Sequence, residues 1–230
     1  MAEPVFVIPA PELPSLAVAG TVARFPLRRI FCVGRNYAEH AREMGHDPNA
    51  EPPFFFTKPG DAVVESGAVI AYPPQTRDLH HEAELVVAIG VGGADISVAA
   101  ALDHVWGYAA GNDLTRRDLQ AAAKAARRPW DMAKGFDQSA VVGALHRAAG
   151  GAVPQGRIRC LVDGEIRQDA DLAEMIWPVA GIIAYLSGLV TLQPGDLIMT
   201  GTPAGVGPIA QGQTCVVEID GLSPASVTVR

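Results

Sequence analysis

The stretch RDLHHEAELVVAIG, residues 77–90, joins two histidines and two glutamates to an apolar run. Successive side chains of a β-strand point to opposite faces, so His80, Glu82 and Glu84 share one face of such a strand. The apolar continuation is typical of a strand inside a sheet, whereas a solvated edge strand is the simpler explanation of an isolated E-x-E pair. The stretch therefore predicts a mainly buried strand with two carboxylates on one face.

Two neighbouring carboxylates in an apolar setting require a counter-charge. Their hard oxygen atoms favour Mg²⁺, Mn²⁺ or Ca²⁺ over zinc, and a third ligand must then come from another segment. Asp113 is the best candidate, because it ends an apolar strand-like stretch, residues 104–113, directly before a helix. The alternative is a structural role, with Asp113 or Thr115 as the helix N-cap and Asp118 completing a capping box.

The helix expected over residues 115–127 carries two arginines in its first turn. The helix dipole disfavours cations at that end, so Arg116 and Arg117 indicate an anionic group nearby. Arg117 and Gln120 are three positions apart and share a helix face, from which they could hold a carboxylate. Lys134 lies among apolar and aromatic residues and is a candidate for partial burial, with a surface lysine as the alternative.

A shorter helix is expected over residues 36–45, with Asn36 as its N-cap. His40 and Glu43 are three positions apart in it, so the carboxylate can orient the imidazole and raise its basicity. This pair is a minimal general base for activating water, although a helix histidine is more often structural. The loop that follows, residues 46–53, suggests a mobile lid.

Short strands separated by turns dominate the rest of the chain. The 24 glycines and 18 prolines among 230 residues favour many strands over a helical bundle. A charge-free stretch, residues 175–195, predicts a buried helix that begins at Pro178, is capped near Gly188 and is too short to span a bilayer. We predict a Pro-rich arm over residues 1–25 and one β-rich domain with a few short helices over residues 26–230. Further strands are expected at residues 28–34 and 68–73, and Asp-Gly hairpins at 159–168 and 216–229.

Composition argues against several function classes. The net charge of -7 and the pI near 5.3 disfavour nucleic-acid binding, which needs a basic face. The 3 cysteines form no zinc or disulfide pattern and the N-terminus has no signal-peptide pattern, so a cytoplasmic location is expected. The loop TGTPAGVGP, residues 200–208, could bring backbone amides close to a ligand, but it is not a P-loop, and no G-x-S-x-G elbow is present.

Several motifs occur in order along the chain: GRNYAEHARE, HHEAEL, GNDLTRRDLQ, WDMAKGFD and TGTPAGVGPI. Together they resemble the fumarylacetoacetate hydrolase family, in particular its short-chain acylpyruvate hydrolase branch, over residues 28–230. The resemblance implies a β-sandwich roll, a homodimer and one Mg²⁺ or Mn²⁺ per subunit. It also implies hydrolysis of the C–C bond of a 2,4-dioxo acid such as fumarylpyruvate, which yields fumarate and pyruvate in gentisate degradation.

The resemblance further implies roles for individual residues. The positions that match the family's functional residues are, as metal ligands, Glu82, Glu84 and Asp113; as the water-activating pair, His40 and Glu43; as stabiliser of developing negative charge, Lys134; and as substrate contacts, Arg35, Arg117, Gln120 and Thr202. Long-chain members have a further aspartate ligand where this chain has Val33, so water or substrate oxygens must complete the metal shell. A distal substrate carboxylate needs its own cation, for which Arg35, Lys58 and Arg128 are candidates.

Two other functions remain open at this point. Decarboxylation of oxaloacetate, or isomerisation of a 2-oxo-dienedioate, would use the same metal and an enolate without attacking water, and the pair of His40 and Glu43 favours hydrolysis over both. A non-catalytic, metal-stabilised β-domain that acts through partners would leave a 2,4-dioxo acid unchanged.

Overall fold

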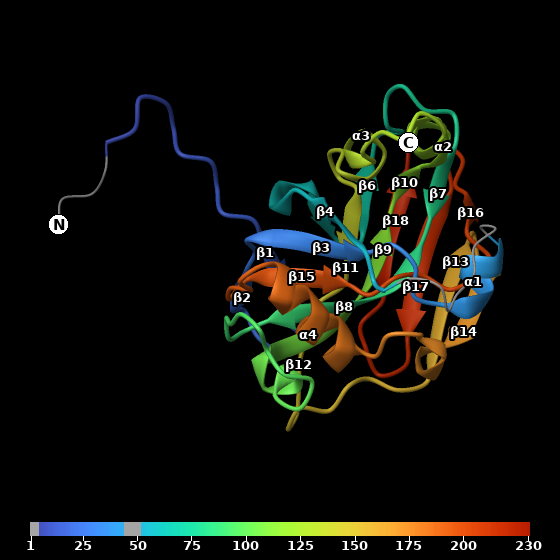
Figure 1. Cartoon of the computed structure of the whole chain (residues 1–230). Coiled ribbons are helices and arrows are strands. Elements are labelled where there is room, and N and C mark those ends of the chain that lie inside the picture. Colours follow the sequence, from blue (N-terminus) through green and yellow to red (C-terminus); the bar gives the residue numbers. More distant parts are fainter. Residues whose placement is uncertain (1–4, 44–51) are drawn as a thin grey trace.

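The computed structural model describes residues 5–43 and 52–230, apart from the side chains of Ala41 and Glu43. Two β-sheets pack against each other around a shared core, and short helices connect their strands (Figure 1). This architecture confirms the β-rich roll with a few short helices that the sequence predicts.

The larger sheet has eight strands. β8 lies between β15 and β9 and all of its residues are buried, which confirms the interior strand expected from residues 84–91. The strand order is β4 (Phe55–Lys58), β3 (Arg29–Val33), β15 (Asp196–Met199), β8 (Ala83–Ile89), β9 (Val105–Asp113), β11 (Ala140–Val142) and β5 (Val63–Glu65), with β12 (His146–Arg147) also paired to β9.

The remaining strands form three smaller sheets. The five-stranded sheet has the order β14 (Glu165–Asp171), β13 (Arg157–Val162), β17 (Thr214–Ile219), β18 (Ala225–Val229) and β6 (Ala68–Ile70). The three-stranded sheet has the order β10 (Thr115–Arg116), β7 (Leu79–His81) and β16 (Gly207–Pro208), and the two-stranded sheet pairs β1 (Ser15–Ala17) with β2 (Arg24–Pro26).

The helices of the described residues are short. α4 (Val179–Leu189) follows Pro178 as predicted, and no helix within residues 5–43 and 52–230 has the length and apolarity needed to cross a membrane. The others are α1 (Ala38–Glu43), α2 (Arg117–Ala125) and α3 (Asp131–Lys134), with 3₁₀ turns η1 (Gly60–Ala62), η2 (Ala101–His104) and η3 (Leu172–Glu174).

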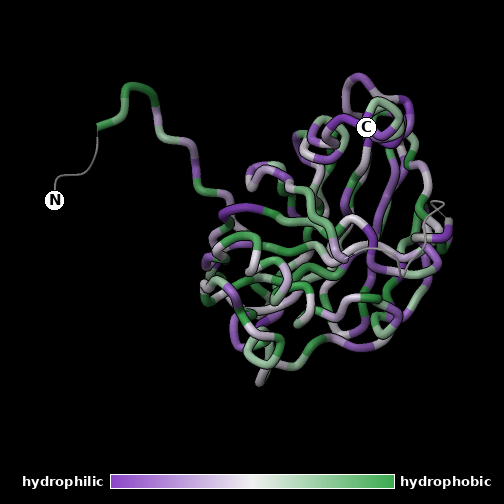
Figure 2. The backbone as a smooth tube through the Cα atoms, in the orientation of Figure 1, coloured by the Kyte–Doolittle hydropathy of each residue, from purple (hydrophilic) through white to green (hydrophobic). Residues whose placement is uncertain are grey.

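The central strand contributes to two apolar clusters, one on each face of the large sheet. Leu85 and Val87 pack in the main core between the two large sheets, while Val86 and Ala88 pack with Leu16 on the opposite face. Figure 2 shows hydrophobic segments running through the middle of the body. Burial on both faces explains why this strand is continuously apolar instead of alternating.

Both Asp-Gly hairpins form where they are predicted. Asp163 and Gly164 have φ angles of 50° and 83°, the left-handed pair that a two-residue type I′ turn requires. The second hairpin joins β17 to β18 through a longer loop, residues 220–224.

Part of the predicted N-terminal arm, residues 1–25, is paired as a two-stranded ribbon. β1 and β2 pair within residues 15–26, and Leu16 and Phe25 are buried against the large sheet. Strands of three residues, in a segment that also contains prolines and Gly20, are too short to show a periodic pattern in the sequence. Residues 5–14 have no regular structure and extend away from the body (Figure 1).

The predicted helix start at residue 115 is wrong. Thr115 and Arg116 are extended and pair with β7, and α2 begins only at Arg117. Neither Asp113 nor Thr115 caps it, because Asp113 ends β9 and the Thr115 hydroxyl donates to the Asp113 carbonyl oxygen at 3.0 Å. The pairing with β7 outweighs the local capping signal, so the capping alternative fails.

Asn36 is not the helix N-cap that the sequence suggests. Its side chain is buried and donates to the carbonyl oxygens of Thr200 at 2.8 Å and Trp177 at 3.0 Å. It therefore ties the segment before α1 to the strand end after β15. The end of the predicted helix, and most of the predicted lid over residues 46–53, lie outside the described residues.

Candidate active site

Three carboxylates come together where the large sheet meets the three-stranded sheet. Glu82 lies between β7 and β8, Glu84 is on β8, and Asp113 ends the neighbouring strand β9. The amide of Asp113 donates to the carbonyl oxygen of Glu82 at 2.9 Å, which fixes the register of the two strands at this point. All three side chains are buried, and one carboxylate oxygen from each lies within 4.8 Å of the others. The three predicted ligands thus form one cluster.

Buried cations surround two of these carboxylates. Lys134 bridges them, with its Nζ 2.7 Å from an oxygen of Glu82 and 2.7 Å from one of Asp113. The other oxygen of Asp113 pairs with Lys58 at 2.7 Å, and that of Glu82 pairs with Arg117 at 2.6 Å. Lys134 is thus buried and paired, and the surface-lysine alternative is wrong.

Glu84 has a different environment. Its carboxylate accepts a hydrogen bond from the amide of Gly201 at 2.7 Å and has no ion pair with any other described residue. Burial and the nearby charges of Asp113 and Glu82 raise its pKa well above the ordinary value. Burial also acts to raise the pKa of Glu82, but Lys134 and Arg117 outweigh it and lower that pKa. Glu84 therefore needs either a proton or an added cation.

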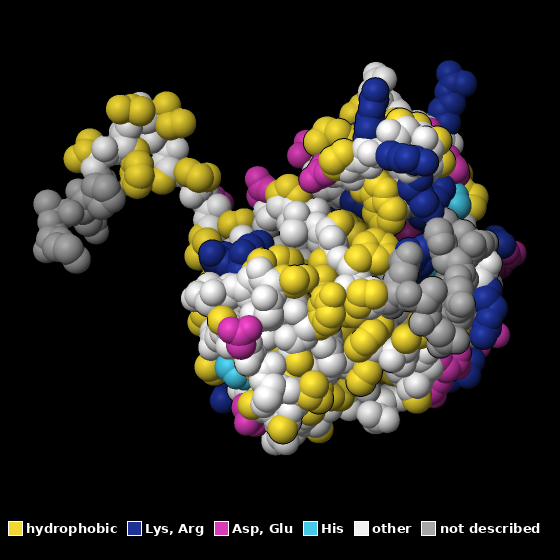
Figure 3. Space-filling model, in the orientation of Figure 1, with side chains coloured by type: hydrophobic (Ala, Val, Ile, Leu, Met, Phe, Trp, Pro, Cys, Tyr) yellow, Lys and Arg dark blue, Asp and Glu magenta, His cyan; other side chains and the backbone are white. Residues whose placement is uncertain are grey.

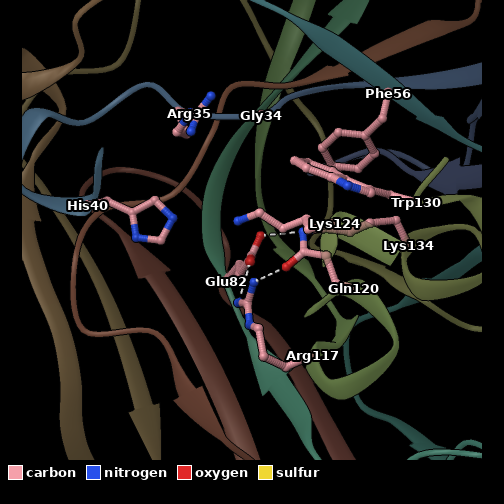
Figure 4. A pocket seen from close by; sticks show the side chains of 10 residues that line it. All are labelled: Gly34, Arg35, His40, Phe56, Glu82, Arg117, Gln120, Lys124, Trp130 and Lys134. Carbon is pink, nitrogen blue, oxygen red and sulfur yellow. Dashed lines mark hydrogen bonds and ion pairs between the residues drawn. The ribbon is translucent and has the colours of Figure 1, made fainter. Parts of the chain in front are cut away.

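A pocket opens beside Glu82. Figure 4 shows Arg35 and His40 on one side of this carboxylate, with Phe56 and Trp130 on another. His40 is buried, and its positive charge, when present, would favour ionised Glu82. Glu43 lies in α1, but its side chain is outside the described residues, so its pairing with His40 stays a prediction. The lining residues are Gly34, Arg35, His40, Phe56, Glu82, Arg117, Gln120, Lys124, Trp130 and Lys134.

Arg117 and Gln120 both line the pocket and contact each other. The guanidinium of Arg117 donates to Gln120 Oε1 at 2.6 Å and to Glu82 Oε1 at 2.6 Å. The predicted carboxylate partner of this helix face is thus Glu82, a member of the carboxylate cluster. Arg117, at the start of α2, faces this acidic group, which accounts for its unfavourable position at a helix N-terminus. Arg116 does not face it, because it precedes α2 and its guanidinium donates to the carbonyl oxygens of Pro74 and Met132.

Thr202, a predicted substrate contact, is not among the residues that line the pocket. Its hydroxyl accepts a hydrogen bond from Gln168 Nε2 at 2.8 Å. Gln168 Oε1 accepts from the amide of Ala83 at 3.0 Å, and Asn112 Oδ1 accepts from the amide of Glu82 at 3.0 Å. The side-chain amides of Gln168 and Asn112 thus take the place of backbone hydrogen bonds between strands where β7 ends and β8 begins. The strand can therefore break at Glu82 without leaving backbone N–H groups unpaired.

The sequence reasoning missed several residues of this site. Lys124 and Trp130 line the pocket, and Gln168 and Asn112 support the strand break. The sequence predicts Lys58 only as a candidate cation for a distal substrate carboxylate. Its position in the apolar stretch FFFTKPG, residues 54–60, is the signal that could have indicated a buried, paired lysine. Gln168 and Asn112 have no comparable signal in the sequence, because the residues that they contact are distant in sequence.

A profile of the family described as "Fumarylacetoacetate (FAA) hydrolase C-terminal" matches residues 29–230. The chain belongs to the fumarylacetoacetate hydrolase family. The match begins at the first residue of β3 and includes both large sheets and all of the clustered side chains. The resemblance carried by the five ordered motifs is therefore confirmed.

Known members of the fumarylacetoacetate hydrolase family are similar over most of this chain. The crystal structure of fumarylpyruvate hydrolase from Pseudomonas aeruginosa, in complex with Mn²⁺ and pyruvate, is 51% identical, with a TM-score of 0.95 and coverage of 98% of this chain and 99% of that one. Fumarylpyruvate hydrolase from a Ralstonia species is 44% identical over 183 residues, 80% of this chain and 95% of the relative. The mitochondrial oxaloacetate decarboxylase of Dictyostelium discoideum is 42% identical over 204 residues, 85% of this chain and 90% of the relative.

Proposed function

We propose that this protein is a divalent-metal-dependent hydrolase that cleaves the C–C bond of a 2,4-dioxo acid, with fumarylpyruvate as substrate and fumarate and pyruvate as products. The observation that carries the proposal is the cluster of three buried carboxylates, one of which, Glu82, lines a pocket together with His40 and Lys134. The similarity to two fumarylpyruvate hydrolases supports this choice of substrate.

Glu82, Glu84 and Asp113 would hold one Mg²⁺ or Mn²⁺. Three carboxylate oxygens within 4.8 Å of one another are hard donors at a spacing that a single ion can bridge. The cluster also needs positive charge, because Glu84 is buried beside two other carboxylates without a cation of its own among the described residues. When bound, the ion would act as a Lewis acid on the carboxylate and 2-oxo oxygens of the substrate.

The side chains around the cluster supply the remaining chemistry. His40 accepts a proton from the water that attacks the C4 carbonyl carbon. The C3–C4 bond then breaks, the C4 acid leaves, and the electron pair remains on pyruvate as its enolate until C3 is protonated. Lys134 stabilises this developing negative charge, and its neighbours keep it charged: burial alone would lower its pKa, but Asp113 and Glu82 raise it.

An ultraviolet assay tests the proposal. Fumarylpyruvate, acetylpyruvate and oxaloacetate are each mixed with the protein, with and without Mn²⁺. Loss of the 2,4-dioxo absorption is followed for the first two, and loss of the enol absorption for oxaloacetate. We expect Mn²⁺-dependent loss with fumarylpyruvate, and fumarate and pyruvate in equal amounts. A 2,4-dioxo acid that persists with and without Mn²⁺ would instead support a metal-stabilised domain without hydrolase activity.

Oxaloacetate decarboxylation is the second candidate, because a mitochondrial oxaloacetate decarboxylase is similar over 85% of this chain. It would use the same carboxylate cluster and Lys134, but it needs no attacking water. A substitution of His40 therefore separates the two reactions: hydrolysis depends on it and decarboxylation does not. Isomerisation of a 2-oxo-dienedioate would be detected as a spectral shift without cleavage.

The biological setting is also part of the proposal. The family resemblance supports a homodimer and a role in gentisate degradation, and the acidic composition supports an enzyme that does not bind nucleic acid. We place this enzyme in the cytoplasm, without membrane binding. We keep the division into an N-terminal arm, residues 1–25, and a single catalytic domain, residues 26–230. Sedimentation of the purified chain would test the dimer.

A further inference from the structure

The described residues that line the active-site pocket include several cations. Among the described lining residues, Arg35, Arg117, Lys124 and Lys134 are cations and Glu82 is the one carboxylate. Arg117 and Lys134 are already paired with Glu82, at 2.6 and 2.7 Å. Lys124 forms no ion pair with any residue in the described ranges, so its charge is available to a ligand.

Lys124 continues a face of α2 that already contributes to the site. Arg117, Gln120 and Lys124 are spaced i, i+3 and i+7, so their side chains lie on one side of the helix. At a rise of about 1.5 Å per residue, Lys124 lies roughly 10 Å further along the helix axis than Arg117. Arg117 pairs with Glu82 at one end of this helix face, and we call the opposite end, at Lys124, its outer end.

Arg35 provides a second cation near the same outer end. It follows β3, and its guanidinium lies 4.9 Å from the ring centroid of Phe54, while Lys124 Nζ lies 5.7 Å from that of Trp130. Burial is the main cause that lowers the pKa of Lys124, and the charges of Arg35 and Arg117 add to it. Figure 3 shows Lys and Arg side chains gathered over the part of the surface where Figure 1 places α2. Like charges held close together at a half-buried rim favour an anion between them.

The other two cations considered for a distal carboxylate do not reach this position. Lys58 is fully buried, pairs with Asp113 at 2.7 Å and is absent from the pocket lining. Arg128 is exposed and lines a separate hollow with Phe55. Arg35 therefore remains a candidate cation for the distal carboxylate, and Lys124 is a further one.

We propose that Lys124, with Arg35 beside it, forms a second anion subsite that binds the distal carboxylate of a dicarboxylic 2,4-dioxo acid. This assignment rests on the proposed function. The substrate's 1-carboxylate and 2-oxo oxygens would face the carboxylate cluster, and its other carboxylate, at the far end of the carbon chain, would reach the outer end of the α2 face. The subsite selects fumarylpyruvate over an acylpyruvate that ends in a methyl group.

A comparison of two substrates in one variant tests this. In Lys124→Met, we expect the ratio of kcat/KM for fumarylpyruvate to that for acetylpyruvate to fall about 10- to 100-fold, the scale of losing a charge-assisted hydrogen bond. The fall should come mainly from KM, and Lys124→Arg should restore most of the ratio. The matched control is Arg128→Met, which should keep the wild-type ratio. An unchanged ratio in Lys124→Met, or the same loss in Arg128→Met, overturns the assignment.

Equilibrium binding separates failure of this inference from failure of the proposed function. If the wild type cleaves neither substrate, the hydrolase proposal fails, and calorimetry with fumarate still tests the subsite. Weaker fumarate binding by Lys124→Met than by the wild type would support the subsite. Equal fumarate affinity in the two proteins would refute it.

Discussion

Glu84 differs from its two neighbouring carboxylates in how its charge is balanced. Lys58, Lys134 and Arg117 stabilise Asp113 and Glu82, whereas Glu84 accepts one backbone hydrogen bond. A carboxylate in this position binds a divalent cation strongly, because the ion relieves repulsion from both neighbours. At the residue scale, Glu84 should therefore be the side chain on which metal binding depends most.

Replacing Glu84 tests this directly. Glu84→Gln keeps an oxygen that can accept from the amide of Gly201, but it removes the negative charge. We expect the purified variant to retain almost no Mn²⁺ after dialysis, as measured by elemental analysis, while the wild type retains about one ion per chain. Glu218→Gln, at an exposed position on β17, is the control and should keep its metal. A Glu84→Gln protein with a full metal content would contradict the ligand assignment.

His40 is the residue on which hydrolysis should depend without affecting the metal. It lines the pocket beside Glu82 but is not part of the carboxylate cluster. We expect His40→Ala to lower kcat for fumarylpyruvate by about 100-fold or more, the usual scale for loss of a general base. Its metal content should equal that of the wild type. Wild-type turnover in this variant would remove His40 from the mechanism.

At the scale of elements, the loop after β15 shows why a glycine is needed. Gly201 has a φ of 93°, its amide donates to Glu84, and a Cβ atom there would lie 2.8 Å from Cβ of Asn36. The Asn36 side chain cannot move away, because it is held by hydrogen bonds to Thr200 and Trp177. The loop thus joins α1, β15 and the carboxylate cluster through one close contact.

Gly201→Ala should destabilise the protein more than backbone strain alone explains. A left-handed alanine costs about 1–2 kcal/mol, and the clash with Asn36 adds to it. Gly212→Ala is a matched control, since Gly212 has a φ of 87° but no atom within 4 Å of the added Cβ. Urea denaturation should show a larger loss in the free energy of unfolding for Gly201→Ala. Equal losses would mean that the contact with Asn36 relaxes freely.

At the scale of the whole molecule, the metal should stabilise the fold. Its three proposed ligands come from β8, from β9 and from the break between β7 and β8, and so from segments of two sheets. Binding at 100 times Kd contributes about 2.7 kcal/mol, which for a chain of this size raises Tm by roughly 5–10 °C. Thermal unfolding after chelation, with and without added Mn²⁺, measures this shift. Glu84→Gln should show almost no Mn²⁺-dependent shift, and a wild type that does not respond to Mn²⁺ would contradict a metal site in this cluster.

The fold was predictable wherever local pattern and tertiary environment agree. β8 is indicated by its continuous run of apolar residues. The turn at Asp163 and Gly164 is indicated by two residue types that tolerate the left-handed conformation. The ribbon of β1 and β2 and the extended start before α2 were not predicted. The ribbon is a local pair, but Leu16 and Phe25 pack against the large sheet, and the residues before α2 pair with β7. In both cases, contacts with residues distant in sequence decided the backbone conformation over the local preference.

The sequence by itself determined the family, the main strands and the identity of the three clustered carboxylates, because these depend on residue types at fixed short spacings. Only the tertiary structure decided which cations neutralise them. Lys58 and Lys134 are far apart in sequence, yet both lie at 2.7 Å from Asp113, whereas Lys124, close to Lys134 in sequence, forms no ion pair with a described residue. Charge pairing depends on distance in space, and that distance is fixed by how the two sheets and α2 pack together.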